Sequence, residues 1–79
     1  MMTTLACISP GNKARIVRVR RTAATNRKLA DMGVTRNTVV TVKRIAPLGD
    51  PIEIKVRGYS LAIRKADAEG IDVQEVKSA

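Results

Sequence analysis

The side chains that usually carry out catalysis are scarce in this sequence. Histidine is absent, which removes the commonest general base and a common metal ligand. Cys7 is the single cysteine, and because it has no basic neighbour in sequence, we expect a small core residue in an apolar strand. The seven carboxylates are scattered, with no spacing that pairs two of them around a substrate. We therefore expect no enzyme and no catalytic residues.

Ligands for metals and phosphates are equally sparse. One cysteine without histidine cannot build a closed transition-metal site, so only a weak carboxylate site at Asp67, Glu69 and Asp72 stays open. The glycines are isolated, each at an expected turn, and none forms a phosphate-binding loop. We expect neither a metal nor a cofactor, which leaves binding to a partner as the class of function.

Positive charge is unevenly distributed along the chain. There are 15 Lys and Arg against 7 Asp and Glu, a net charge of 15 − 7 = +8. The cations that precede the first acid, Asp31, are Lys13, Arg15, Arg18, Arg20, Arg21, Arg27 and Lys28. A segment of one sign attracts an acidic protein face, a phosphate backbone or an anionic membrane, although a simply solvated surface explains it equally well.

Tyr59 is the only aromatic residue, and this narrows the nucleic-acid alternative. Single-stranded nucleic acid is usually held by stacking on several aromatic side chains. Binding to a duplex through phosphates needs only Lys and Arg, and that alternative stays open. A groove that binds proline-rich peptides is likewise lined by several aromatic side chains, and one tyrosine cannot form it.

The N-terminal segment does not resemble a targeting or membrane segment. Residues 1–12 carry no charge, lack a basic n-region and contain Pro10 and Gly11. They also fall far short of the roughly 20 apolar residues that span a bilayer. With one cysteine, no internal disulfide can form. We expect a cytoplasmic protein without membrane insertion.

Val and Ile dominate the apolar residues, and β-branched side chains favour strands. The patterns predict strands over residues 5–8, 14–19, 38–45, 52–57, 59–63 and 71–76, with a helical turn over 65–69. A bulge or sharp bend at Gly58 would explain why the alternation changes parity there. Such short strands predict a mainly β fold: a small closed barrel of five to six strands with one or two short helices.

Two connecting segments complete this expected organisation. Residues 25–32 predict a helix with Leu29 and Met32 on one face, closed by Gly33 in the left-handed conformation. At barely two turns it is too short to be stable alone, so we expect Leu29 and Met32 in the core. The turn over residues 46–51 contains Pro47 and Pro51, and it predicts a hairpin with a rigid tip.

The order of several short motifs resembles the FeoA family, the small cytoplasmic component of bacterial ferrous iron transport. These motifs are Leu29-Ala30-Asp31-Met32-Gly33-Val34, Ala46-Pro47-Leu48-Gly49-Asp50-Pro51-Ile52, Gly58-Tyr59-x-Leu61-Ala62-Ile63-Arg64 and Ala68-x-x-Ile71-x-Val73. The resemblance implies one SH3-like domain over residues 1–79, an accessory protein that binds and modulates the cytosolic GTPase domain of the FeoB permease. The family usually has Pro-Gly at Arg36-Asn37, and asparagine tolerates the positive φ of such a turn.

The candidate partner-binding residues are Leu48, Tyr59, Arg64, Lys65, Arg18, Arg20 and Arg21. Leu48, at a hairpin tip, either folds back over the barrel mouth, which is the interpretation that we favour, or anchors a partner. Two alternatives stay open: a basic barrel that binds nucleic acid through phosphates, and a weakly homo-oligomeric adaptor that packs through Leu48 and Tyr59.

Overall fold

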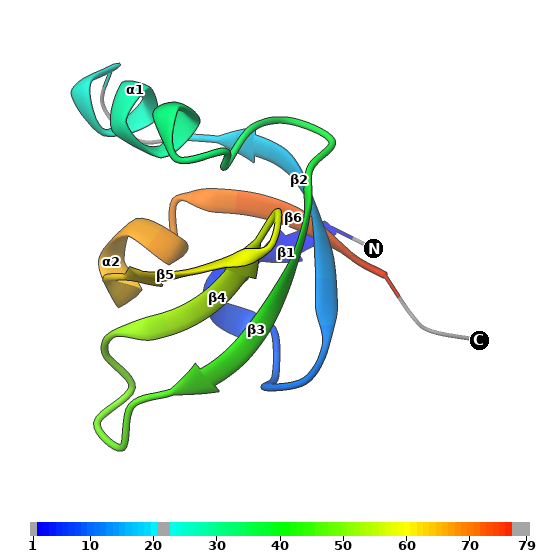
Figure 1. Cartoon of the computed structure of the whole chain (residues 1–79), viewed down its shortest axis with the longest axis vertical. Helices are drawn as coiled ribbons and strands as arrows, with labels where there is room; N and C mark the ends of the chain where they lie inside the picture. Colours follow the sequence, from blue (N-terminus) through cyan, green and yellow to red (C-terminus); the bar gives the residue numbers. More distant parts are fainter. Residues whose placement is uncertain (1, 21–22, 77–79) are drawn as a thin grey trace.

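A computed structural model describes residues 2–20 and 23–76 of the chain. Its antiparallel strands form one six-stranded sheet in the order β1-β6-β2-β3-β4-β5, which curls around the core (Figure 1). The strands are β1 (Met2–Thr4), β2 (Lys13–Val19), β3 (Val39–Ile45), β4 (Ile52–Val56), β5 (Tyr59–Ile63) and β6 (Ile71–Val76). The helices are α1 (Ala23–Asp31), α2 (Lys65–Ala68) and the 3₁₀ turn η1 (Leu5–Cys7). The expected mainly β fold is confirmed.

The N-terminal segment differs from the prediction. A strand over residues 5–8 is wrong: β1 pairs with β6 before that point, and η1 follows it. Leu5 and Ile8 are both buried. A strand would point residues three apart to opposite faces, whereas a 3₁₀ turn brings them to the same side. Burial of both side chains therefore explains the helical turn.

The core is aliphatic and comes from alternate positions of the strands. Along β4, Ile52, Ile54 and Val56 are buried, while Glu53 and Lys55 face outward. The remaining strand residues of the core are Ala14, Ile16, Val40, Val42, Ile63, Ile71 and Val73. This period of two is the pattern that the sequence predicts for a half-buried antiparallel strand.

The connection between β4 and β5 corrects the expected bend at Gly58. Arg57 (φ 48°) and Gly58 (φ 93°) form a two-residue turn, and Val56 pairs directly with Tyr59. Positive φ at both positions is the conformation that matches the twist of a tight hairpin. Since the two strands are antiparallel partners rather than one bent strand, the paired residues share a face and the parity changes.

Helix α1 ends as the sequence predicts. Gly33 adopts a φ of 91°, and the Val34 N–H donates to the Leu29 carbonyl at 2.9 Å, closing the last turn. Leu29 is buried in the core, so the docking of α1 through this residue is confirmed. Met32 is only half-buried and stands outside the core, which corrects its expected place.

The loop after α1 is held against β2. Asn37 has a φ of 72°, as expected for an asparagine in place of glycine, and its N–H donates to the Ile16 carbonyl at 2.7 Å. The Ile16 N–H in turn donates to the Thr38 carbonyl at 2.8 Å. These bonds extend the pairing of β2 with β3 by one residue beyond the ladder.

Gly33→Ala should destabilise the fold more than Gly11→Ala. Both glycines have a φ near +90°, so each substitution carries the left-handed penalty of about 1–2 kcal/mol. A Cβ at Gly33 would also lie 3.3 Å from Val56 Cγ1, whereas nothing lies within 4 Å of one at Gly11. Urea unfolding of the two variants measures the difference. Equal losses would contradict any added cost of the Val56 contact.

Candidate partner-binding surface

The turn between β3 and β4 is closed by its own backbone. The Gly49 N–H donates to the Ala46 carbonyl at 2.7 Å, and the Ala46 N–H donates to the Pro51 carbonyl at 3.1 Å. Gly49 supplies the positive φ of 86° that this path requires, and the Asp50–Pro51 peptide bond is cis. The result is the compact tip that the two prolines predict, and it lies at the far end of the molecule from α1 (Figure 1).

Leu48 at this tip is 95% exposed. The expectation that it folds back over the barrel mouth is therefore wrong. With so little of its surface covered, the leucine has almost no contact with the rest of the fold. The alternative interpretation, an apolar group that anchors a partner, stays a prediction.

Two of the other candidate residues lie next to the hairpin. The Lys65 N–H donates to Asp50 Oδ1 at 3.0 Å, which ties the start of α2 to the turn. Arg64 and Lys65 are both exposed. A groove of about 670 Å³ runs beside the turn between the ends of β3 and β4 and the middle of β5; its lining includes Pro47 and Leu61. Leu48, Arg64 and Lys65 therefore belong to one region of the surface.

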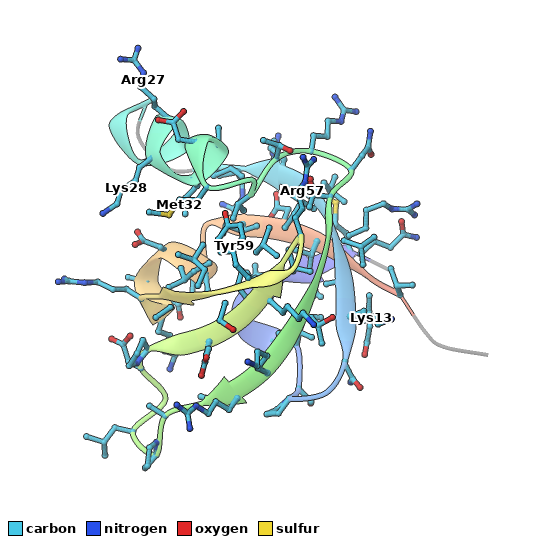
Figure 2. All side chains as sticks on the ribbon, viewed as in Figure 1. Lys13, Arg27, Lys28, Met32, Arg57 and Tyr59 are labelled. Carbon is cyan, nitrogen blue, oxygen red and sulfur yellow. The ribbon has the colours of Figure 1, made fainter. Side chains whose placement is uncertain are left out.

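Tyr59 lies elsewhere. It begins β5 near the α1 end of the molecule (Figure 2), and its hydroxyl would be 3.6 Å from a Cβ at Gly33. The ring is 44% exposed. Because the hairpin tip lies at the opposite end, Leu48 and Tyr59 do not form one patch. This separation is evidence against a homo-oligomeric adaptor that packs through both residues at a single contact.

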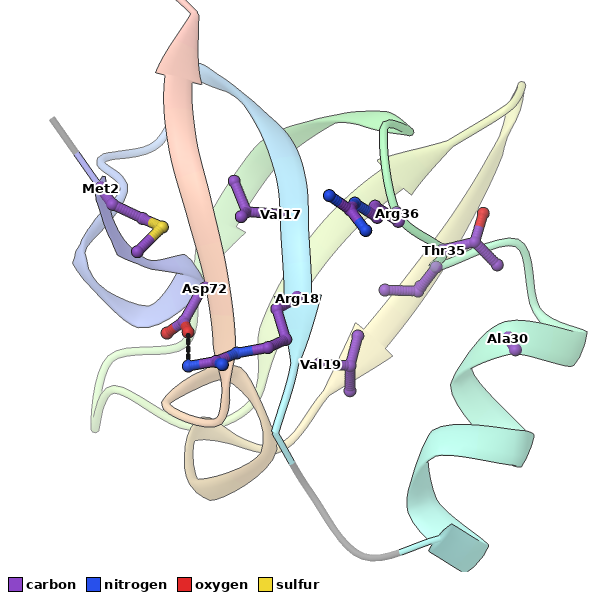
Figure 3. A pocket seen from close by; sticks show the side chains of 9 residues that line it. Met2, Val17, Arg18, Val19, Ala30, Thr35, Arg36 and Asp72 are labelled. Carbon is purple, nitrogen blue, oxygen red and sulfur yellow. Dashed lines mark hydrogen bonds and ion pairs between the residues drawn. The ribbon is translucent and has the colours of Figure 1, made fainter.

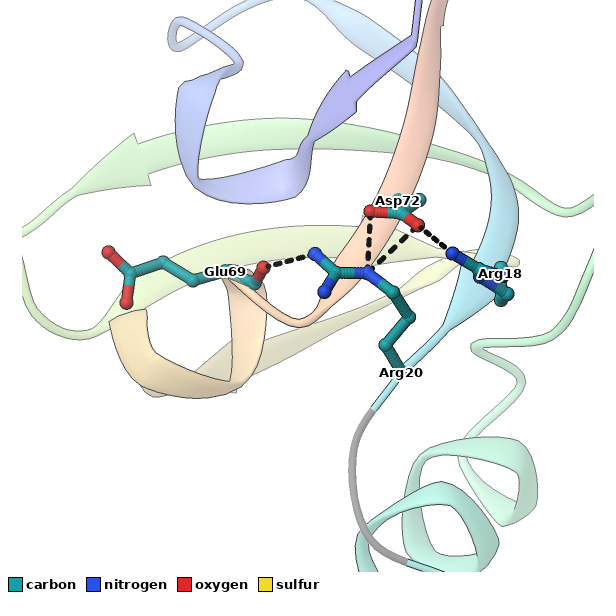
Figure 4. A network of polar contacts seen from close by, with 4 residues as sticks. All are labelled: Arg18, Arg20, Glu69 and Asp72. Carbon is teal, nitrogen blue, oxygen red and sulfur yellow. Dashed lines mark hydrogen bonds and ion pairs between the residues drawn. The ribbon is translucent and has the colours of Figure 1, made fainter.

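Arg18 and Arg20 converge on one carboxylate (Figure 4). Arg20 Nε donates to both oxygens of Asp72 at 2.9 Å, and Arg18 Nη2 donates to Oδ2 at 3.3 Å. Arg20 Nη2 also donates to the Glu69 carbonyl at 3.2 Å, next to the end of α2. Asp72 is only 8% exposed. These two arginines therefore have a structural role, and Arg21 lies outside the described residues.

Asp72→Ala should lower the free energy of unfolding by about 1–2 kcal/mol, because two arginines lose their charged acceptor. Both guanidinium groups are substantially exposed and can hydrate again, which limits the loss. Glu53→Ala is the control, since Glu53 pairs with the 81% exposed Arg44 and should cost under about 1 kcal/mol. Urea unfolding at neutral pH compares them; a larger loss in the control would contradict the role of Asp72.

Cys7 is exposed, which corrects its expected place in the core. It ends η1, where the Thr4 hydroxyl donates a hydrogen bond to Sγ at 3.5 Å and lowers the pKa of the thiol.

Within the described ranges, no group of three or more Cys, Asp or Glu side chains could hold a metal ion. Asp72, one of the three carboxylates left open as a weak metal site, is already paired with arginine. Among the residues described, no helix is both long and apolar enough to cross a membrane.

Further exposed cations project from the outward positions of β2 and β4, outside the candidate residues that the sequence indicates. Lys13 and Arg15 project from β2, and Lys55 projects from β4. Arg57 follows Lys55 in the tight turn, with Nη2 3.4 Å from Thr38 Oγ1. The pairing of β2 with β3 and of β3 with β4 places Lys13 in one row with Lys55, with Thr41 between them, and Arg15 in the next row.

Comparison with known proteins places the chain in a family. The FeoA domain model matches residues 3–75. A Porphyromonas gingivalis protein described as an Fe(2+) transport protein A/Fe(2+) transporter FeoB fusion protein is 31% identical over 74 residues, covering 94% of this chain. The match spans only 9% of that fusion protein.

Solved structures agree with this assignment. The solution structure of FeoA from Chlorobium tepidum is 37% identical, with a TM-score of 0.91 over 95% of this chain and 71% of that one. A Stenotrophomonas maltophilia FeoA complexed with zinc, described as an SH3 domain protein, has a TM-score of 0.80 at 24% identity. It covers 91% of this chain and 89% of its own, and it supports the expected SH3-like fold. With a family model that matches nearly its whole length, the chain belongs to the FeoA family.

Proposed function

We propose that this protein is a non-enzymatic accessory of ferrous iron uptake that binds the cytosolic GTPase domain of a FeoB permease and modulates its nucleotide cycle. The observation that supports this most directly is the relative that carries an FeoA segment and FeoB in a single chain. Covalent linkage raises the effective concentration of one module around another. Such a fusion is useful when the two modules act together.

The hairpin tip offers a suitable anchor for this interaction. Leu48 is a large aliphatic side chain held in solvent on a closed turn. A preorganised contact loses less conformational entropy on binding than a flexible one. Arg64 and Lys65, joined to the same turn through Asp50, add positive charge at the rim, where it steers association with an acidic face.

Replacing Leu48 by serine should weaken binding to FeoB by at least about tenfold, the effect expected when a buried anchor is truncated. The fold should be unaffected, because Leu48 packs against nothing in the free protein. Biolayer interferometry with full-length cognate FeoB in nanodiscs, loaded with a non-hydrolysable GTP analogue, measures the affinity.

Leu48→Met is the matched control, because it keeps a large apolar side chain and should bind almost as well as the wild type. A photo-leucine at position 48 then identifies the contacted domain: cross-linked peptides should come from the GTPase domain. Cross-links confined to the transmembrane part, or unchanged affinity of Leu48→Ser, would count against this use of the hairpin. Absence of binding by the wild-type protein would overturn the proposed function itself.

A further inference from the structure

The outer face of the sheet carries two rows of paired residues that cross several strands. In one row, Lys13 of β2 lies opposite Thr41 of β3, Thr41 lies opposite Lys55 of β4, and Lys55 lies opposite Ser60 of β5. Directly paired residues project from the same face of a sheet. Since Ala14, Val40 and Ile54 alternate with this row and are buried in the core, the row itself faces outward.

The second row lies next to the first and mixes charged with apolar side chains. Met2 and Arg15 are both paired with Gln74 of β6, and Arg15 is paired on its other side with Val39. Met2 is 59% exposed and Val39 is 46% exposed. An exposed valine therefore lies in the centre of a face whose flanking strands carry cations.

The cations of this face have no acidic partner within the described residues. Carboxylates neutralise other cations: Asp72 pairs with Arg18 and Arg20, and Glu53, two residues before Lys55 on β4, pairs with Lys43 and Arg44. By contrast, the polar contact of Arg15 is to a neutral group, Gln74, and Lys13 and Lys55 have no polar contact among the described residues. We call the cations of Lys13, Arg15 and Lys55 the basic face.

An apolar groove adjoins the basic face. It has a volume of about 540 Å³, and its lining includes Met2, Val17 and Val19, with Arg36 reaching in from the loop after α1 (Figure 3). Exposed aliphatic side chains beside unpaired cations are typical of a surface for a partner that offers both carboxylates and apolar groups. Phosphates alone would leave Met2, Val17 and Val39 without a function.

The geometry points to the basic face as the surface that receives an acidic face of the GTPase domain, with Val39 as its apolar contact. This inference rests on the proposed function and adds to it the place and the charge of the contact. The turn that presents Leu48 connects β3 and β4, and these same strands carry Val39 and Lys55. Val39 begins β3 and the turn follows the end of β3, so the hairpin tip and the basic face are two separate contacts along one pair of strands.

Reversing the charge of the basic face should weaken binding to FeoB without unfolding the protein. The double variant Lys13→Glu/Lys55→Glu is the test, and Arg27→Glu/Lys28→Glu on α1 is the control with the same change in net charge. All four side chains are exposed. At low salt we expect the basic-face variant to lose at least about tenfold in affinity, mainly through slower association, and the control to lose less than about threefold. A neutral variant, Lys13→Gln/Lys55→Gln, should show an intermediate loss and avoids any repulsion within the sheet.

Four outcomes separate the alternatives when affinity is measured with full-length FeoB in neutral-lipid nanodiscs, a DNA duplex and vesicles of anionic lipid. Selective loss of FeoB binding in the basic-face variants supports the inference. Equal losses in the basic-face variant and its control overturn it, and the proposed function stands if Leu48→Ser still weakens binding. Tighter binding of the wild-type protein to DNA or to anionic vesicles than to FeoB also overturns it, in favour of a phosphate-bearing partner. No FeoB binding by the wild-type protein overturns the proposed function and this inference together.

Discussion

The constraint on which the rest of the structure depends is the division of the sheet into an aliphatic inner face and a largely polar outer face. With no Phe or Trp, the core is filled by small branched side chains such as Ile16, Val42 and Ile54, each of which is completely buried. A short strand can bury such residues only if the sheet curls around them. Curling in turn leaves every alternate residue on a convex outer surface, where Lys13, Arg15 and Lys55 lie among neutral residues such as Thr41 and Val39.

Turns with positive φ set the ends of this curled sheet. Arg57 and Gly58 turn β4 directly into β5, and Asn37 joins α1 to β3 while donating to the backbone of β2. Because these turns are short, they permit little choice of register. The register then decides which outward residues become neighbours, so the arrangement of charge follows from the backbone of the turns as much as from the strands.

The parts of the fold that were predicted correctly are those with local signals. The alternation in residues 52–56, the left-handed Gly33 and the asparagine at position 37 each depend on a residue and its near neighbours. The errors came where distant contacts decided the outcome. Leu5–Cys7 forms a helical turn because two side chains share the core, and Leu48 stays in solvent because no distant element covers it. Arg18 and Arg20 looked like free cations until β6 brought Asp72 beside them.

The sequence by itself determined the class of this protein: a small β fold, a strong positive charge, scarce catalytic side chains and an order of motifs that matches one family. Composition and short-range pattern suffice for these conclusions, since they depend on what the residues are. Only the tertiary structure decided which charged side chains form ion pairs within the fold and which stay unpaired at the surface. That distinction depends on the pairing of strands far apart in the chain: β6 brings Asp72 next to β2, and β3 joins Lys13 and Lys55 in one row. Strand register, which no single segment encodes, therefore decides which side chains lie together on the surface.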